Sequence, residues 1–182
     1  MRPSIAPVAI CVPVRLNLRL QSSSVPVSRP ALSVTVRVTT WAPGVVNVWL
    51  SNALKPLGYH YAPDPSSQIA CTIGGNVAEN SGGVHCLKYG LTTNNLLGCE
   101  LVLMSGEIVR FGGKAMDAEG YDLLGLVTGS EGLLGVVTEV TVRILPKPET
   151  VKAMLLGFQS VEAAGAVVGD IIAAGVIPAG LE

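Results

Sequence analysis

Residues 63–90 form a stretch rich in glycine, asparagine, serine and threonine, residue types that let the backbone approach a ligand closely. Two glycine pairs, Gly74-Gly75 and Gly82-Gly83, leave main-chain N–H groups unshielded because no Cβ covers them. Few core-filling side chains occur here, so ordering the stretch costs entropy that a bound group would offset. The pattern indicates an anion site for a phosphate-bearing cofactor, with an ordinary glycine-rich turn as the alternative.

A second glycine block, Gly129-Ser130-Glu131-Gly132, follows a predicted helix and precedes a predicted strand. In a Rossmann unit this order is reversed, with the strand before the glycines and the helix after them. The sequence also lacks G-x-x-x-x-G-K-[ST], and no G-x-G-x-x-G follows a strand. A P-loop kinase and a Rossmann dehydrogenase are therefore disfavoured.

Together the two glycine-containing regions resemble a known family. The motifs are Pro63-Asp64-Pro65-Ser66-Ser67, Thr72-Ile73-Gly74-Gly75-Asn76-Val77-Ala78-Glu79-Asn80-Ser81-Gly82-Gly83 and Gly129-Ser130-Glu131-Gly132-Leu133-Leu134-Gly135-Val136-Val137-Thr138-Glu139. They resemble the PCMH-type FAD-binding domain of the FAD-linked oxidases, the vanillyl-alcohol oxidase superfamily. Within it the sequence is most similar to the branch that contains the glycolate oxidase D-subunit and the flavin-dependent D-lactate and D-2-hydroxyglutarate dehydrogenases. The resemblance covers roughly residues 43–182 and implies FAD as cofactor.

The resemblance also implies which residues contact FAD. The pyrophosphate is expected at the backbone amides of Ile73, Gly74, Gly75 and Asn76, and the ribityl or flavin region at Pro65, Ser66 and Ser67. The isoalloxazine side is expected at Gly82, Gly83, Tyr89 and Gly90, and the adenosine half at Glu131, Gly132, Val136 and Val137. Asn80 completes the expected cofactor set. No catalytic residue is assigned, and His85 is interpreted as structural because a lone histidine in a turn usually is.

By the same resemblance, the reaction is oxidation of a small 2-hydroxy acid, such as glycolate or D-lactate, by hydride transfer to flavin N5. An iron–sulfur or flavin subunit is a candidate electron acceptor. The base and the substrate-binding arginines are expected in a cap domain, so the 182 residues alone are expected to turn over little substrate. The alternatives are a non-catalytic remnant of the flavin lobe and another flavoenzyme with a PCMH-type domain.

Charge is distributed unevenly along the chain. Net charge is −1, which gives no reason to expect nucleic acid, yet residues 1–63 contain six bases and no acid. Residues 1–37 match nothing in the family, which has its first flavin lobe at this place, and they are left unassigned. A truncated or out-of-frame start is favoured over an organelle transit peptide, and the chain is interpreted as a fragment.

Cysteine and histidine are sparse. Four cysteines without a C-x-x-C pair and two histidines predict free thiols in a reducing compartment and no metal site. No apolar run reaches the roughly 18 residues that a membrane span requires. A cytoplasmic protein is expected, with peripheral membrane association as an alternative.

The predicted fold class is α+β, with a mixed or antiparallel sheet and flanking helices. Residues 38–145 are expected to form the incomplete FAD-binding domain, and residues 146–182 a linker and the start of a truncated cap domain. The expected helices are Val45–Leu54, Tyr121–Val127 and Val161–Ala174, the last capped by Ser160. The expected strands begin at Val34 and then cover Asn94–Met104, Glu107–Phe111, Gly135–Ile144 and Val151–Phe158.

Overall fold

The computed structural model describes residues 19–22, 32–37, 44–113 and 120–181. Its strands are β1 (Arg19–Ser22), β2 (Leu32–Arg37), β3 (Tyr59–His60), β4 (Leu96–Val102), β5 (Ile108–Gly112) and β6 (Val136–Pro146). Its α-helices are α1 (Asn47–Leu54), α2 (Ile73–Glu79), α3 (Cys86–Tyr89), α4 (Leu123–Val127) and α5 (Val161–Ala173). Two short 3-10 turns, η1 (Lys55–Leu57) and η2 (Thr93–Asn95), complete the list.

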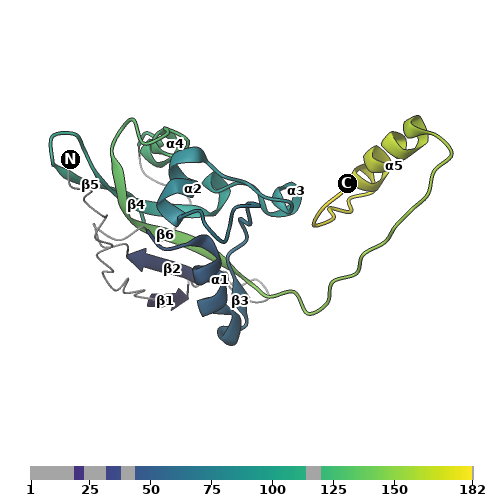
Figure 1. Ribbon diagram of the computed structural model, residues 1–182, viewed down its shortest axis with the longest axis horizontal. Helices are drawn as coiled ribbons and strands as arrows, with labels where there is room; N and C mark the ends of the chain where they lie inside the picture. The colour runs from purple at the N-terminus through teal and green to yellow at the C-terminus, as the bar shows by residue number, and fades with distance from the viewer. Residues whose placement is uncertain (1–18, 23–31, 38–43, 114–119, 182) are drawn as a thin grey trace, which may run out of the picture.

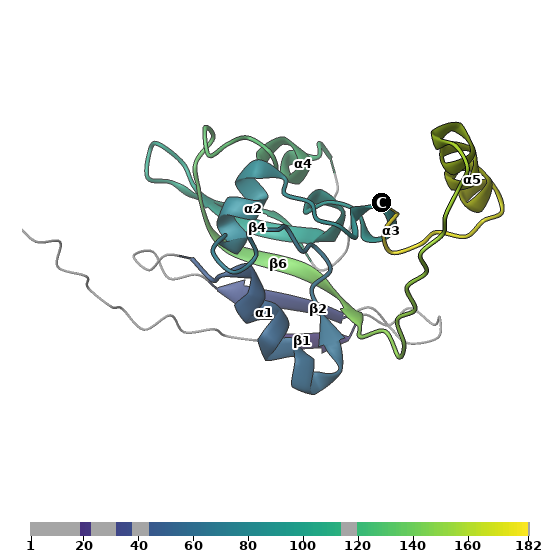
Figure 2. The same ribbon diagram turned by 45° about the vertical axis from the view of Figure 1, so that its right-hand side comes forward.

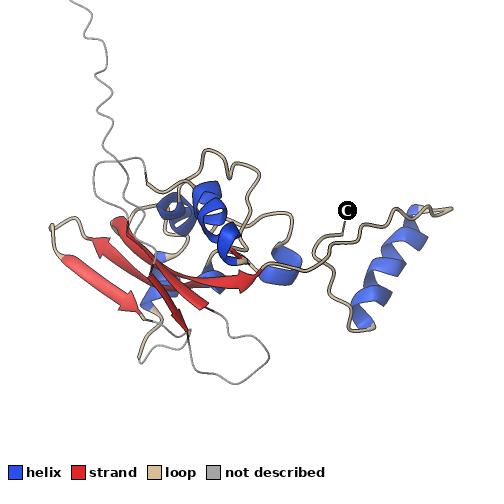
Figure 3. Cartoon of the chain, turned by 90° about the horizontal axis from the view of Figure 1, so that it is seen from below, coloured by secondary structure: helices blue, strands red, loops and turns tan. Residues whose placement is uncertain are grey.

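The strands form one sheet in the order β1-β2-β6-β4-β5, and β3 pairs with the end of β6. Each pairing is antiparallel. The 11-residue strand β6 lies between β2 and β4 and is the longest described strand (Figures 1 and 3). The expected α+β fold with an antiparallel sheet is therefore confirmed.

Alternating side chains along β6 separate the two faces of the sheet. Val140, Val142 and Ile144 are buried, whereas Glu139, Thr141 and Arg143, which alternate with them, are partly exposed on the opposite face. This is the period of two that a half-buried strand requires. Helices α1, α2 and α4 cover the apolar face, as Figure 2 shows.

The core is made where these helices meet the sheet. Leu50 and Leu54 of α1 and Ile73 and Val77 of α2 are completely buried. With the apolar side chains of β6 and β4 they form a single hydrophobic cluster. Aliphatic side chains dominate this cluster, in keeping with a sequence of which only 4% is aromatic.

The sheet extends further towards the N-terminus than the expected domain start at residue 38. Strand β2 pairs with β6 along its whole length, from Leu32 opposite Ile144 to Arg37 opposite Glu139. Strand β1 then pairs with β2. The predicted strand beginning at Val34 is thus confirmed, and it belongs to the same sheet as the later motifs. The other residues before 38, and residues 114–119, lie outside the described residues.

The prediction of a strand at Val151–Phe158 was wrong. These residues have irregular backbone, and Leu155 is fully exposed. A strand is stable only with a hydrogen-bonded partner, and no described residue pairs with this segment. Its apolar composition alone therefore misled the prediction.

Helix α5 begins at Val161 as expected and ends at Ala173, one residue before the expected end. Ser160 caps it by accepting a hydrogen bond from the Ala163 amide at 3.2 Å, and Gly175 follows it with a φ of +77°. An extended segment separates α5 from the sheet, and the C-terminal tail returns towards α3 (Figures 1 and 2). Among the described helices, none combines the length and apolar character needed to span a bilayer.

We expect Leu101→Ala in β4 to lower the free energy of unfolding by about 2–5 kcal/mol, because Leu101 is 1% exposed and its truncation leaves a cavity in the core. The matched control is Leu155→Ala, which removes the same atoms from a fully exposed side chain and should cost less than about 0.5 kcal/mol. Urea unfolding followed by circular dichroism measures both values. Equal effects of the two substitutions would contradict the core assignment.

Candidate functional site

The residues expected to bind the FAD pyrophosphate form the first turn of α2. Thr72 precedes the helix and accepts a hydrogen bond from the Gly75 amide through its hydroxyl at 3.1 Å. The Ile73 amide donates to the Val45 carbonyl, and the Asn76 amide donates to the Thr72 carbonyl, both at 2.8 Å. Of the four amides expected to bind pyrophosphate, these three therefore already donate hydrogen bonds within the protein.

Asn76 is the polar side chain at this helix start with an unmet hydrogen-bonding requirement. Only 1% of the residue is exposed, and its Nδ2 has no hydrogen-bond partner among the described residues. A buried donor left without an acceptor costs about 1–3 kcal/mol. An acceptor oxygen supplied by a bound ligand would satisfy it.

The second glycine block is attached to the C-terminal end of α2 by two main-chain hydrogen bonds. The Gly129 amide donates to the Val77 carbonyl and the Glu131 amide to the Ala78 carbonyl, both at 2.8 Å. Glu131 has a φ of +55°, a left-handed conformation that is uncommon for residues other than glycine. The structure thus brings together two motifs that lie far apart in the sequence.

The β6 end of the same block packs against the start of α2. A Cβ built on Gly74 would lie 3.6 Å from the Val137 carbonyl oxygen, an ordinary van der Waals distance. Val136, the preceding residue, is 67% exposed, and Gly132 is exposed in a left-handed turn. Gly74, expected at the pyrophosphate, and Val137, expected at the adenosine half, are therefore neighbours in space.

Three glycines of the remaining expected set lie against other residues of the chain. A Cβ added to Gly83 would collide with Asp64, and one added to Gly90 would lie 2.5 Å from the Asn94 carboxamide oxygen. A Cβ on Gly82 would lie 2.5 Å from the end of the Leu91 side chain. Close packing within the protein is thus one physical reason for glycine at these positions.

The other predicted contacts lie in the two loops on either side of α2. Pro65 accepts a hydrogen bond from the Gln68 amide at 2.8 Å, which closes the turn that presents Ser66 and Ser67 to solvent. The ring of Tyr89 meets the ring of His60 edge-on, with centroids 5.9 Å apart. Burial lowers the pKa of His60, so this imidazole is neutral at pH 7.

His85 is not the lone histidine that the sequence suggested. Its Nδ1 lies 2.5 Å from Oδ2 of Asp64, a residue 21 positions earlier in the chain. No sequence spacing signals a contact between two loops, so the pair escaped the sequence analysis. Among the described residues, no group of three histidine, cysteine, aspartate or glutamate side chains has the arrangement of a metal site.

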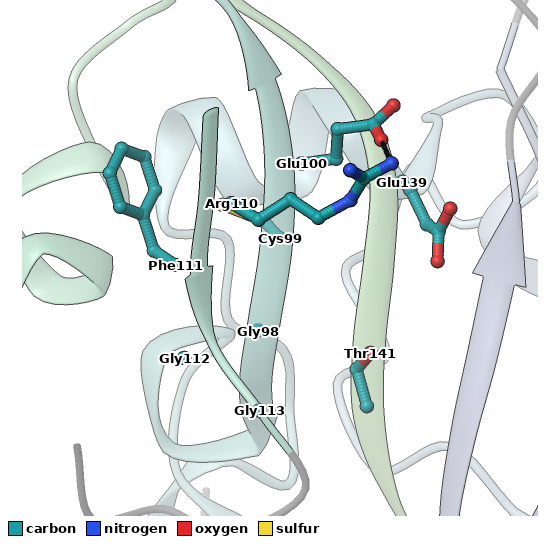
Figure 4. A pocket seen from close by; sticks show the side chains of 9 residues that line it. All are labelled: Gly98, Cys99, Glu100, Arg110, Phe111, Gly112, Gly113, Glu139 and Thr141. Carbon is teal, nitrogen blue, oxygen red and sulfur yellow. Dashed lines mark hydrogen bonds and ion pairs between the residues drawn. The ribbon is translucent and has the colours of Figure 1, made fainter. Parts of the chain in front are cut away.

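A separate cavity of about 220 Å³ lies on the opposite face of the sheet. Figure 4 shows Arg110 of β5 reaching to Glu100 of β4, with Glu139 of β6 beside them. Glu100 also accepts a hydrogen bond from the Thr138 hydroxyl at 2.8 Å. Burial raises the pKa of Cys99 in the cavity lining to about 11, so this thiol stays protonated and unreactive at pH 7. None of the expected FAD contacts lines this cavity.

Comparison with known proteins gives the family. The family described as FAD binding domain matches residues 31–112. Glycolate oxidase subunit GlcD of Escherichia coli (strain K12) is 62% identical over 140 residues, which cover 77% of this chain and 28% of the relative. The Bacillus subtilis (strain 168) protein of the same name is 51% identical over 144 residues, covering 79% and 31%.

A D-lactate dehydrogenase of Anaerostipes hadrus is 39% identical over 120 residues, covering 65% of this chain and 25% of the relative. A solved structure of alkyldihydroxyacetonephosphate synthase has a TM-score of 0.64 at 23% identity, covers 81% of this chain and 25% of that chain, and supports the fold. This chain belongs to the FAD-linked oxidases with a PCMH-type FAD-binding domain, and FAD is the cofactor of that domain. It spans less than a third of the length of these curated relatives.

We expect Asn80→Ala to destabilise the fold by about 2 kcal/mol, because Asn80 ends α2 with a φ of +51° and accepts a hydrogen bond from the Thr93 amide at 3.0 Å. Asn80→Gly should cost about 1 kcal/mol, since glycine tolerates this φ and only the hydrogen bond is lost. Chemical unfolding of both variants measures the difference. Equal losses would show that the left-handed conformation contributes nothing.

Proposed function

We propose that this chain supplies the FAD-binding portion of an oxidoreductase that oxidises a small 2-hydroxy acid such as glycolate or D-lactate. The observation that carries the proposal is the attachment of the 129–131 block to α2 by two main-chain hydrogen bonds. Both attached motifs lie within a chain that is 62% identical, over 140 residues, to a protein named as a glycolate oxidase subunit.

The described residues fit FAD at the start of α2. The unpartnered Nδ2 of Asn76 is a donor suited to a phosphate or carbonyl oxygen, and Gly74 presents backbone without a Cβ beside Val137. We propose that the cofactor contacts are Pro65, Ser66, Ser67, Ile73, Gly74, Gly75, Asn76, Asn80, Gly82, Gly83, Tyr89, Gly90, Glu131, Gly132, Val136 and Val137. The three engaged amides of α2 then act mainly by holding Gly74 and Asn76 in place.

When bound, FAD supplies an acceptor for the hydride that leaves the carbinol carbon of the substrate. The residues of this chain bind and orient the cofactor through main-chain groups and small side chains, which limits the reorganisation required on binding. The neutral ring of His60 packs against Tyr89 and places an uncharged side chain beside the loop at 81–91. We assign binding of the substrate carboxylate and removal of the substrate hydroxyl proton to groups other than these residues.

A second part of the proposal concerns electron transfer. Two of the similar proteins are named as subunits of glycolate oxidase. We propose that this protein likewise passes electrons to a partner subunit carrying an iron–sulfur centre or a flavin.

We expect the purified chain to bind FAD, and Gly74→Ala to weaken that binding at least tenfold while leaving the fold intact. In the free protein the added Cβ meets only ordinary contacts with Val137, and alanine favours a helix over glycine by about 0.5–1 kcal/mol. In the complex the added methyl group would narrow the space between α2 and Val137, beside the proposed phosphate position. Flavin fluorescence titration gives the affinity, and thermal unfolding reports the fold.

The matched control for this substitution is Gly165→Ala in α5, where a Cβ would meet no atom within 4 Å. It should leave FAD affinity unchanged. FAD binding to Gly74→Ala with wild-type affinity would remove Gly74 from the site.

We expect glycolate or D-lactate to bleach the flavin absorbance near 450 nm of the whole protein under anaerobic conditions, because hydride transfer reduces the bound cofactor. The control is the L-enantiomer of lactate, which should bleach it far more slowly. A whole protein whose bound FAD is not bleached by any 2-hydroxy acid would support a non-catalytic flavin-binding protein instead.

A further inference from the structure

The pair formed by Asp64 and His85 lies between two loops that belong to different parts of the chain. The loop at 63–68 precedes α2, and the loop at 81–91, which includes the short helix α3, follows it. His85 Nδ1 and Asp64 Oδ2 are 2.5 Å apart, a contact in which the protonated ring nitrogen donates to the carboxylate. The side chains are 45% and 25% exposed respectively, so the contact is partly shielded from water.

Close packing supports the same contact. A Cβ on Gly83 would collide with both the carboxylate and the carbonyl group of Asp64. Any side chain at position 83 would push the two loops apart and break the bond to His85. The second glycine of the Gly82-Gly83 pair therefore serves the approach of Asp64.

Each of the two loops is anchored separately to the body of the domain. The loop at 63–68 is held by Asn47, whose buried Nδ2 donates to the Pro63 carbonyl at 3.1 Å. The loop at 81–91 is held by Asn95, whose Nδ2 donates to the Tyr89 and Leu91 carbonyls at 2.9 Å. Because both loops are anchored in this way, the Asp64–His85 contact sets the distance between them.

We propose that Asp64 and His85 are positioning residues for FAD, joining the loops that precede and follow α2 and so holding the cofactor contacts on each loop at binding distance. This inference rests on the proposed function. The buried Oδ1 of Asp64 has no hydrogen-bond partner among the described residues, so the carboxylate depends on the contact of its Oδ2 with His85. Loss of the imidazole would leave a partly buried charge without its donor, and the loop at 63–68 would move towards water.

The neighbouring groups do not replace His85. His60 is close enough to Asp64 and His85 to interact electrostatically with both, but burial lowers its pKa and keeps it uncharged at pH 7. Lys88 lies with its ammonium 5.6 Å from the Tyr89 ring centroid. The Asp64 carboxylate therefore has the His85 ring as its hydrogen-bonded partner.

The test measures FAD affinity by flavin fluorescence at pH 7.5 for wild type, Asp64→Ala, His85→Ala, the double variant and Asp64→Asn. We expect each alanine variant to bind FAD about tenfold more weakly and the double variant to lose little more than either single one, because all three break the same contact. Asp64→Asn should recover most of the affinity, since its amide oxygen still accepts from Nδ1–H. The matched control is Glu107→Gln in the β4–β5 turn, which removes an exposed carboxylate and should bind as wild type.

The outcomes separate this inference from the proposed function. Wild type that binds no FAD would overturn both. Two results would overturn the positioning role alone, in a wild type that binds FAD. In one, the alanine variants bind FAD as tightly as wild type; in the other, the double variant loses as much binding free energy as the two single variants together. If Asp64→Ala lowers the thermal midpoint of the free protein, His85→Ala is compared with Asp64→Asn instead. Weak FAD binding by His85→Ala together with near wild-type binding by Asp64→Asn supports the positioning role. Equal FAD affinity of these two variants overturns it.

Discussion

The structure depends on the position of β6 inside the antiparallel sheet. Its hydrogen bonds to β2 and β4 satisfy the backbone on both sides, and its alternating side chains leave one apolar face for α1 and α2. The N-terminal end of the same strand continues from the 129–132 block and packs Val137 against Gly74. One strand therefore supports the core and aligns the two motifs of the candidate site.

Glycine has two different uses around this site. At Gly74 an added Cβ would meet only ordinary van der Waals contacts with Val137, so no clash within the protein requires glycine there, and the role proposed for it is cofactor binding. At Gly83 and Gly90 that space is taken by Asp64 and Asn94, so glycine there permits two segments to pack closely. A glycine-rich motif is thus partly a ligand-binding feature and partly a condition for building the loops that surround the ligand.

The sheet and its helices divide the molecule into two chemically different faces. The helical face carries the glycines and small polar side chains that make up most of the expected FAD contacts, and the uncharged His60 ring packs there against Tyr89. The opposite face carries the Glu100–Arg110 ion pair and a polar cavity, on strands whose inward side chains are apolar.

Local patterns in the sequence determined the helices at 47–54 and 161–173, the hairpin of β4 and β5, and the alternation of β6, because caps, turns and residue periodicity act over a few neighbouring positions. They also identified the family through its two long motifs. The tertiary structure decided which amides of α2 are already engaged, that 151–158 lacks a strand partner, and that Asp64 meets His85. Those features arise from contacts between residues far apart in the chain. Such a contact does not change the residue pattern of either segment, so the pattern of one segment does not predict it.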